Sequence, residues 1–139
     1  MPPRHSIVID TGVLISAFAF GGAPAKAVFK TFSEADLFVS RPLLKEYRAT
    51  PHALYQAGKI NHEQYLALIA GIAAFVSKAV LVVPRKHFHI CRDTKDNMVL
   101  DCCHAANADI LISGDKDLLN IAGLPFPLRI INVRTYLTT

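Results

Sequence analysis

Two aspartates, Asp10 and Asp115, lie far apart in the sequence but have closely similar surroundings. Each follows a short apolar run, Ile7–Ile9 or Ile110–Ile112, and each lies close to a hydroxyl residue. Because ligands bind beyond the carboxyl ends of the strands in a parallel α/β sheet, two carboxylates at strand ends can meet at one place. Converging carboxylates repel one another, and a proton or a divalent cation relieves that repulsion. The sequence therefore predicts an acidic metal site.

The charge distribution supports a cation site next to a polyanionic ligand. The chain has 139 residues and a formal net charge of +4. The window 93–117 contains six of the 11 acids but two of the 15 Lys and Arg residues, so its net charge is −4 and that of the remainder is +8. An acidic cluster within a basic protein suits a cation held near a polyanionic substrate, although acids also cluster on ordinary solvated faces.

Hydrophobic periodicity predicts strands that alternate with helices. Strands are expected at 6–10, 37–39, 81–83, 110–112 and 128–133. Helices are expected at 23–34, 61–78, 96–107 and 116–121, and Asn61 and Gln64 form a capping pair at the start of the second of these. A further helix is expected to begin after a cap at Ser40 and to be interrupted at Thr50-Pro51. This order predicts a three-layer α/β sandwich with a mostly parallel central sheet of about five strands.

Length and composition indicate one domain over residues 1–139. A hydrophobic content of 52% is typical of a globule with a large core. No apolar run approaches the ~20 residues of a membrane span, and no secretory signal is evident, so we expect a cytoplasmic protein with no membrane partner. The cysteines Cys91, Cys102 and Cys103 show no zinc spacing and are expected to be buried, reduced thiols.

Each acid also has a purely structural interpretation. Asp10 can form an Asx-turn that ends a strand, and Asp115 can cap the helix that follows it. Asp96 can stabilise the first turn of a helix together with Asp93, and an isolated Glu46 is usually a solvated surface residue. A shared Mg²⁺ or Mn²⁺, which prefers carboxylate and water ligands, accounts for all four acids at once.

Four segments together resemble the PIN domain family, and most closely its branch of toxin components from toxin–antitoxin systems. They are Ile7-Val8-Ile9-Asp10-Thr11, Leu44-Lys45-Glu46-Tyr47, Asp93 to Leu100, and Ile112 to Leu119. The resemblance implies a PIN-like fold and a metal-dependent endoribonuclease. It also implies the partners RNA, a cognate antitoxin and a second copy of the chain.

The resemblance assigns a role to individual residues. It implies the catalytic acids Asp10, Glu46, Asp96 and Asp115. Mg²⁺ or Mn²⁺ would be held by Asp10, Asp96 and Asp115, with Glu46 and Asp117 as further candidate ligands. Thr11 and Ser113 would support the site. Many family members carry asparagine two residues after the first aspartate, where this chain has Gly12.

Basic residues flank the acidic segments and are candidates for binding an RNA backbone. They are Arg41, Lys45, Arg48, Lys95 and Lys116. For about half of such residues, ordinary surface solubility is an equally good interpretation.

The sequence is also compatible with other functions. The main alternative is a non-catalytic PIN-like module that binds RNA or a protein. A phosphoacceptor receiver domain normally has an acid pair after its first strand, where this chain has Asp10-Thr11. A haloacid dehalogenase-type phosphatase has Asp-x-Asp there, and Gly12 breaks that motif. An aspartic protease needs a second Asp-Thr-Gly, which only a homodimer would supply.

Overall fold

The computed structural model describes residues 4–139, and five parallel strands form its sheet. They are β1 (His5–Ile9), β2 (Ala35–Ser40), β3 (Ala79–Val82), β4 (Ile110–Ile112) and β5 (Arg129–Ile131). The strand order is β3-β2-β1-β4-β5, and every pairing is parallel. The predicted parallel sheet is confirmed.

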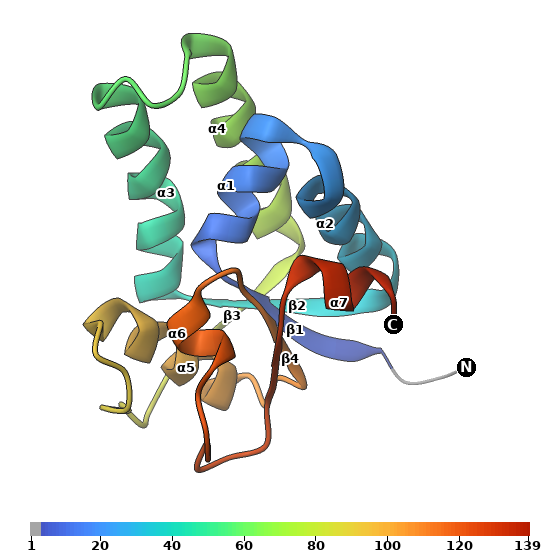
Figure 1. The fold of residues 1–139 in the computed structure, drawn as a ribbon, viewed down its shortest axis with the longest axis vertical. Coiled ribbons are helices and arrows are strands. Elements are labelled where there is room, and N and C mark those ends of the chain that lie inside the picture. Colours follow the sequence, from blue (N-terminus) through green and yellow to red (C-terminus); the bar gives the residue numbers. More distant parts are fainter. Residues whose placement is uncertain (1–3) are drawn as a thin grey trace.

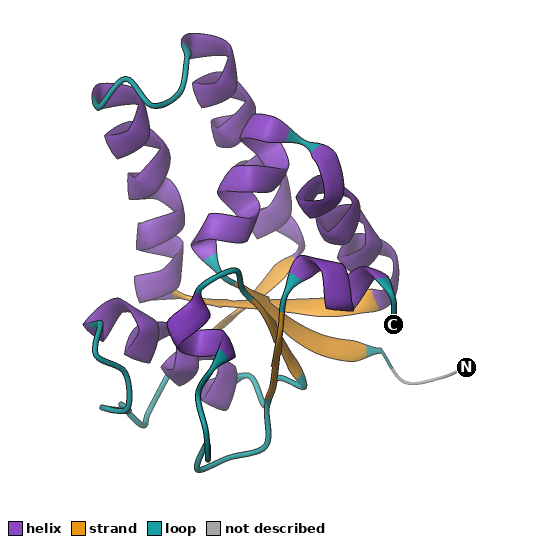
Figure 2. Cartoon of the chain, viewed as in Figure 1, coloured by secondary structure: helices purple, strands orange, loops and turns teal. Residues whose placement is uncertain are grey.

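Helices cover both faces of this sheet (Figures 1 and 2). One face carries α1 (Thr11–Phe20), α2 (Gly22–Glu34), α3 (Arg41–Gln56) and α4 (His62–Lys78), and the short C-terminal α7 (Val133–Leu137) packs against α2 on that side. The opposite face carries α5 (Thr94–Ala105), while α6 (Lys116–Leu119) follows the end of β4. This arrangement is the predicted three-layer sandwich.

The strand order reverses direction between β1 and β4. From β1 the chain proceeds through helices on one face to β2 and β3, and then returns by way of α5 on the other face to β4. In an open parallel sheet such a switch point leaves a crevice beyond the carboxyl ends of the two strands. Asp10 and Ser113 are the residues that follow β1 and β4 there.

The core explains why the strand runs are apolar throughout. Ile7, Val8 and Ile9 of β1 and Leu111 and Ile112 of β4 are all fully buried. Strands covered by helices on both faces have no solvated side, so they read as continuous hydrophobic runs and do not alternate.

The predicted break at Thr50-Pro51 is wrong, because α3 continues through Pro51 to Gln56. Thr50 donates its hydroxyl to the carbonyl of Glu46 at 2.8 Å, and the side chain of Pro51 is buried. Tertiary packing of this helix, with Leu43 and Tyr47 in the core, overrides the local preference of the residue before proline. Its start is as predicted, because the Ser40 hydroxyl accepts from the Leu43 amide at 3.3 Å.

The sequence prediction missed α1 and α7 and placed most other element boundaries one or two residues away from those in the structure, with the first strand ending at Ile9 and not at Asp10. Apolar residues occupy all sides of α1, so it shows no amphipathic period. The fifth strand ends at Ile131 instead of Val133, because Asn132 caps α7. The third strand is Ala79–Val82, two residues earlier at its start than predicted. The predicted capping pair of Asn61 and Gln64 is confirmed, with both reciprocal hydrogen bonds present.

Cys102 and Cys103 are buried as predicted, whereas Cys91 is only half-buried, and all three are free thiols. Within residues 4–139, no single helix is both long and apolar enough to cross a membrane. The pair α1 and α2, bent by 111°, meets that test only when the two helices are taken together.

Gly71 allows α4 to approach α1 closely. A Cβ built at this position would lie 2.3 Å from the ring of Phe18. We therefore expect Gly71→Ala to lower the free energy of unfolding by about 1–3 kcal/mol through overpacking, measured by urea denaturation. The control is Gly12→Ala, where an added Cβ meets no atom of residues 4–139 within 4 Å. Equal stability of the two variants would contradict this account of the α1–α4 contact.

Candidate functional site

The pairing of β1 with β4 places Asp10 against the end of the neighbouring strand. Ile9 lies opposite Ile112, and the Asp10 amide donates to the Ile112 carbonyl at 2.9 Å. Both carboxylate oxygens of Asp10 accept hydrogen bonds. Oδ1 accepts from the Thr11 amide at 2.9 Å, which caps α1, and Oδ2 accepts from the Ser113 hydroxyl at 2.8 Å.

Ser113 connects Asp10 with Asp115. Its side chain is fully buried, and its Oγ accepts from the Asp115 amide at 3.0 Å while donating to Asp10. Asp115 in turn caps α6, because its Oδ1 accepts from the Asp117 amide at 2.8 Å. The two strand-end aspartates noted in the sequence are thus joined by one hydroxyl.

Two helices bring further acids to the same edge. The buried Tyr47 donates its hydroxyl to the Ile9 carbonyl, which anchors α3 to the end of β1 and sets the position of the preceding Glu46. Asp93 caps α5 through a hydrogen bond from the Lys95 amide at 3.0 Å. Asp96, in the first turn of α5, is 7% exposed.

These acids line one cleft of about 730 Å³. The four predicted catalytic acids are all present in its wall, together with Asp93. The other residues of the lining are Gly12, Val13, Ser16, Ala23, Pro24, Lys95, Gly114, Asn132, Val133 and Arg134. Thr11, one of the two predicted supporting residues, lies outside this lining; it is buried, and its Oγ1 has no hydrogen-bond partner within residues 4–139.

A subset of the acids is close enough to share a cation. One carboxylate oxygen from each of Asp96, Asp115 and Asp117 lies within 4.8 Å of the others. Oxygen ligands of one Mg²⁺ are about 3.0 Å apart when adjacent and about 4.2 Å apart when opposite, so these three oxygens would have to move closer together to share one ion. Asp117 is also held by Arg92, whose Nη2 donates to Oδ1 at 2.8 Å. Asp10 lies outside this cluster, with its oxygens directed to Thr11 and Ser113.

Burial and the neighbouring carboxylates disfavour the ionised state of Asp96 and Asp10. Burial, followed by the charges of Asp115, Asp93, Asp10 and Asp117, raises the pKa of Asp96 to about 6. Burial also raises the pKa of Asp10, with smaller contributions from Glu46 and Asp115, although the hydrogen bonds from Ser113 and Thr11 oppose the shift. A divalent cation would relieve this repulsion, so these residues fit a metal site.

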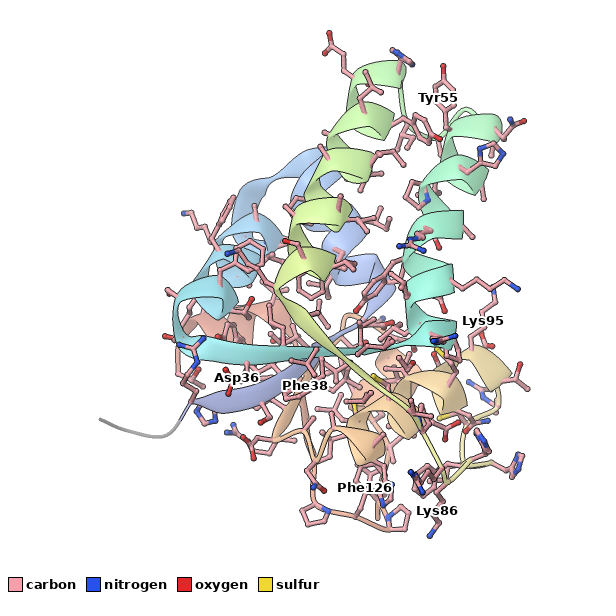
Figure 3. All side chains as sticks on the ribbon, turned by 180° about the vertical axis from the view of Figure 1, so that it is seen from behind. Asp36, Phe38, Tyr55, Lys86, Lys95 and Phe126 are labelled. Carbon is pink, nitrogen blue, oxygen red and sulfur yellow. The ribbon has the colours of Figure 1, made fainter. Side chains whose placement is uncertain are left out.

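The predicted RNA-binding cations separate into different places. Arg41, Lys45 and Arg48 line a second cavity of about 740 Å³, together with Leu44, Ala49, His52 and Leu81. Lys95 lines the acidic cleft, whereas Lys116 is exposed and lines neither cavity. Figure 3 shows Lys95 at the sheet end of α3, far from Tyr55 at the other end of that helix.

Sequence reasoning missed one wall of the cleft. Its residues come from the unpredicted α1, from the start of α2 and from the segment after β5, and they are Val13, Ser16, Ala23, Pro24, Asn132, Val133 and Arg134. The strand-end rule that identified Asp10 applies equally to the residues after the fifth strand. Had the end of that strand been placed correctly, Asn132 and Arg134 would have been found.

Comparisons with known proteins agree with this geometry. Residues 6–117 match a family model described as the PIN domain. An uncharacterized protein of Methanocaldococcus jannaschii is 31% identical over 141 aligned positions, which cover 98% of this chain and 87% of that relative. The structure of VapBC2 from Rickettsia felis bound to a DNA fragment from their promoter is similar in fold, with a TM-score of 0.60 at 14% identity over 91% of this chain and 98% of that chain. The predicted resemblance to the PIN domain family is confirmed.

The raised pKa of Asp96 has a measurable effect on stability. In the folded state the Asp96 carboxyl stays protonated up to a pH of about 6, whereas in the unfolded state, with a pKa of 3.8, it loses its proton at lower pH. The stabilisation by protonated Asp96 is therefore present below pH 4 and is lost as the pH rises through 6. In EDTA at pH 7.5, we expect Asp96→Asn to increase the free energy of unfolding by about 1–3 kcal/mol, with little difference at pH 4.

The matched control is Glu63→Gln, which changes an exposed acid at the start of α4. The free energy of unfolding of this variant, measured in urea, should stay within about 0.5 kcal/mol of the wild-type value at both pH values. If Asp96→Asn gave no gain at pH 7.5, the proposed repulsion among the clustered acids would be wrong.

Proposed function

The chain belongs to the PIN domain family, and from this premise we propose that it is a metal-dependent endoribonuclease. The observation that carries the proposal is the convergence of Asp10, Glu46, Asp96 and Asp115 on one cleft at the topological switch point. Four acids from separate segments repel one another when the site is empty. A bound cation offsets this repulsion, and the clustering of the acids is therefore explained if the site holds a cation that takes part in the reaction.

We assign Mg²⁺ or Mn²⁺ to this site. Asp96 and Asp115 would hold it, joined by Asp10, Asp117 or Glu46, because oxygen ligands and bound water are what these ions prefer. When bound, such an ion lowers the pKa of a water ligand and offsets charge on phosphoryl oxygens.

The residues of the chain orient the reaction. Ser113 holds Oδ2 of Asp10, and the Thr11 amide holds Oδ1, so this carboxylate has a fixed direction. Glu46 supplies another carboxylate, from the second turn of α3, which Tyr47 anchors to β1. The reaction is hydrolysis, in which the oxygen of a water forms the new bond to phosphorus and the 3′ oxygen leaves with a proton. No nucleophile from the protein is required.

We further propose that the protein is the toxin of a toxin–antitoxin pair, acting in the cytoplasm as one domain over residues 1–139. Its fold is shared with VapBC2 of Rickettsia felis, which supports this assignment. An antitoxin or a second copy of the chain would bind an exposed apolar surface of this protein, and α4 offers one. Leu66 and Ile69 of α4 remain 53% and 44% exposed, so the apolar stripe on this helix is only partly used by the core.

The competing function is an RNA- or protein-binding module that does not cleave. Gly12 favours this alternative, because the family commonly has asparagine there and Gly12 lines the acidic cleft. The space beside Gly12 is open, because no atom of the described part of the chain lies within 4 Å of an added Cβ. The missing side chain leaves room for solvent or ligand and removes none of the carboxylates.

Cleavage of single-stranded RNA in Mn²⁺ tests the nuclease assignment. We expect cleavage that EDTA abolishes, and losses of at least about 100-fold in kcat/KM for Asp96→Asn and Asp115→Asn, because each removes a charged ligand of the ion. Glu63→Gln serves again as the control and should cleave at the wild-type rate. Since Asp96→Asn is expected to be the more stable protein, its inactivity would not result from unfolding. Cleavage that persists undiminished in both aspartate variants would refute the assignment.

The toxin assignment is tested in cells. Induced expression of the wild-type chain should arrest bacterial growth, while Asp96→Asn should not, because arrest depends on cleavage of cellular RNA. Co-expression of a small upstream gene that overlaps this one should restore growth. Equal arrest by the wild type and Asp96→Asn would show that any toxicity has another origin.

A further inference from the structure

The cleft is much larger than a metal site. A divalent cation with six waters occupies about 200 Å³, taking about 30 Å³ for each water. The cleft measures about 730 Å³. A hydrated cation would therefore fill less than half of the cleft, and the rest of its volume is available to another ligand.

The two walls of the cleft differ in chemistry. In Figure 1, α3 and α5 lie on one side and α2 and α7 on the other, with α1 between them. The acids Glu46, Asp93 and Asp96 come from α3 and from the start of α5. The other wall comes from α1, the start of α2 and the segment after β5, and among residues 4–139 it contains no acid. It consists of Val13, Ser16, Ala23, Pro24, Asn132, Val133 and Arg134. It thus offers apolar surface, a few neutral polar groups and one cation.

Hydrogen bonds fix the backbone on both sides of Arg134, while its side chain is exposed. Ser113 donates its amide to the Ile131 carbonyl at 3.0 Å, and Asn132 accepts from the Thr135 amide at 2.8 Å, so the start of α7 is attached to the sheet edge. Tyr136 is buried and donates to Glu34 of α2 at 2.9 Å. Arg134 is exposed, and none of the five ion pairs within residues 4–139 involves it.

We propose that this wall is a nucleotide subsite, in which Arg134 binds a phosphate of the RNA and the adjacent nucleoside packs against Val13, Pro24 and Val133. The inference rests on the proposed function, because it takes RNA as the substrate. A nucleotide combines a flat, largely apolar base with a charged phosphate, and this wall presents apolar surface beside a guanidinium. Ser16 and Asn132 add polar groups that can meet the edge of the base.

Two variants test the subsite from its two ends. Arg134→Gln removes the charge, and its matched control is Arg129→Gln, an exposed arginine at the start of the same β5–α7 segment that lies outside the acidic cleft. Ala23→Trp fills the apolar wall from an exposed position, and Ala67→Trp, an exposed alanine of α4 outside the cleft, is its control. The probe is a short, fluorescein-labelled single-stranded RNA, with binding measured by anisotropy in EDTA.

We expect Arg134→Gln to weaken RNA binding about five- to tenfold and to reduce the salt slope of log K by about 0.7, as for the loss of one phosphate contact. Ala23→Trp should weaken binding to a similar extent while leaving Mn²⁺ binding, measured by calorimetry, unchanged. Both control variants should bind RNA within twofold of the wild type. In Mn²⁺, Arg134→Gln should raise KM with kcat largely unchanged, because it removes substrate binding and not chemistry.

RNA binding by Arg134→Gln that equals binding by Arg129→Gln would overturn the subsite, whatever the cleavage assay shows. A wild-type protein that binds RNA and loses that binding in Arg134→Gln, but never cleaves in Mn²⁺, would support the subsite and refute the nuclease. The two proposals can therefore fail separately.

Discussion

The parallel pairing of β1 with β4 is the contact on which the site depends. The register that places Ile9 opposite Ile112 also places Asp10 beside Ser113, and Ser113 then connects Asp10 with Asp115. A slip of one residue would turn the buried side chains of these strands to the other face of the sheet and separate the two carboxylates. The fully buried runs of both strands resist such a slip, so the hydrophobic core and the acidic cleft are determined by the same pairing.

The structural and functional interpretations of the acids turn out to be compatible. Three of the acids are N-caps: Asp10 caps α1, Asp93 caps α5 and Asp115 caps α6. Each side chain accepts a hydrogen bond from a backbone amide. An N-cap holds a carboxylate at the positive end of a helix, which offsets part of the repulsion among clustered acids. Capping leaves Asp115 with a second oxygen for a ligand. The same geometry that ends a strand and begins a helix thus directs the carboxylates toward the cleft.

Sequence reasoning succeeded where the signal is local and failed where tertiary contacts decide. The positions of Asp10 and Asp115 after apolar strands and the Ser40 and Asn61 caps are encoded within a few residues, and the structure has them as predicted. The continuation of α3 through Pro51 depends on packing of Leu43 and Tyr47 into the core, which local propensity does not contain. The helix α1 is apolar on all sides and so lacks a periodic pattern. The position of Arg134 in the cleft depends on where β5 ends, and a strand boundary is among the least certain features of a sequence.

The most direct test of the central claim is the anomalous diffraction of a crystal of this protein soaked in Mn²⁺. We predict a strong manganese peak in the cleft, in contact with carboxylate oxygens of Asp96 and Asp115 and with at least one oxygen of Asp10, Glu46 or Asp117. The same soak of Asp96→Asn crystals should leave the cleft without that peak. A wild-type crystal with no peak in the cleft, or with manganese bound only elsewhere on the molecule, would contradict the account.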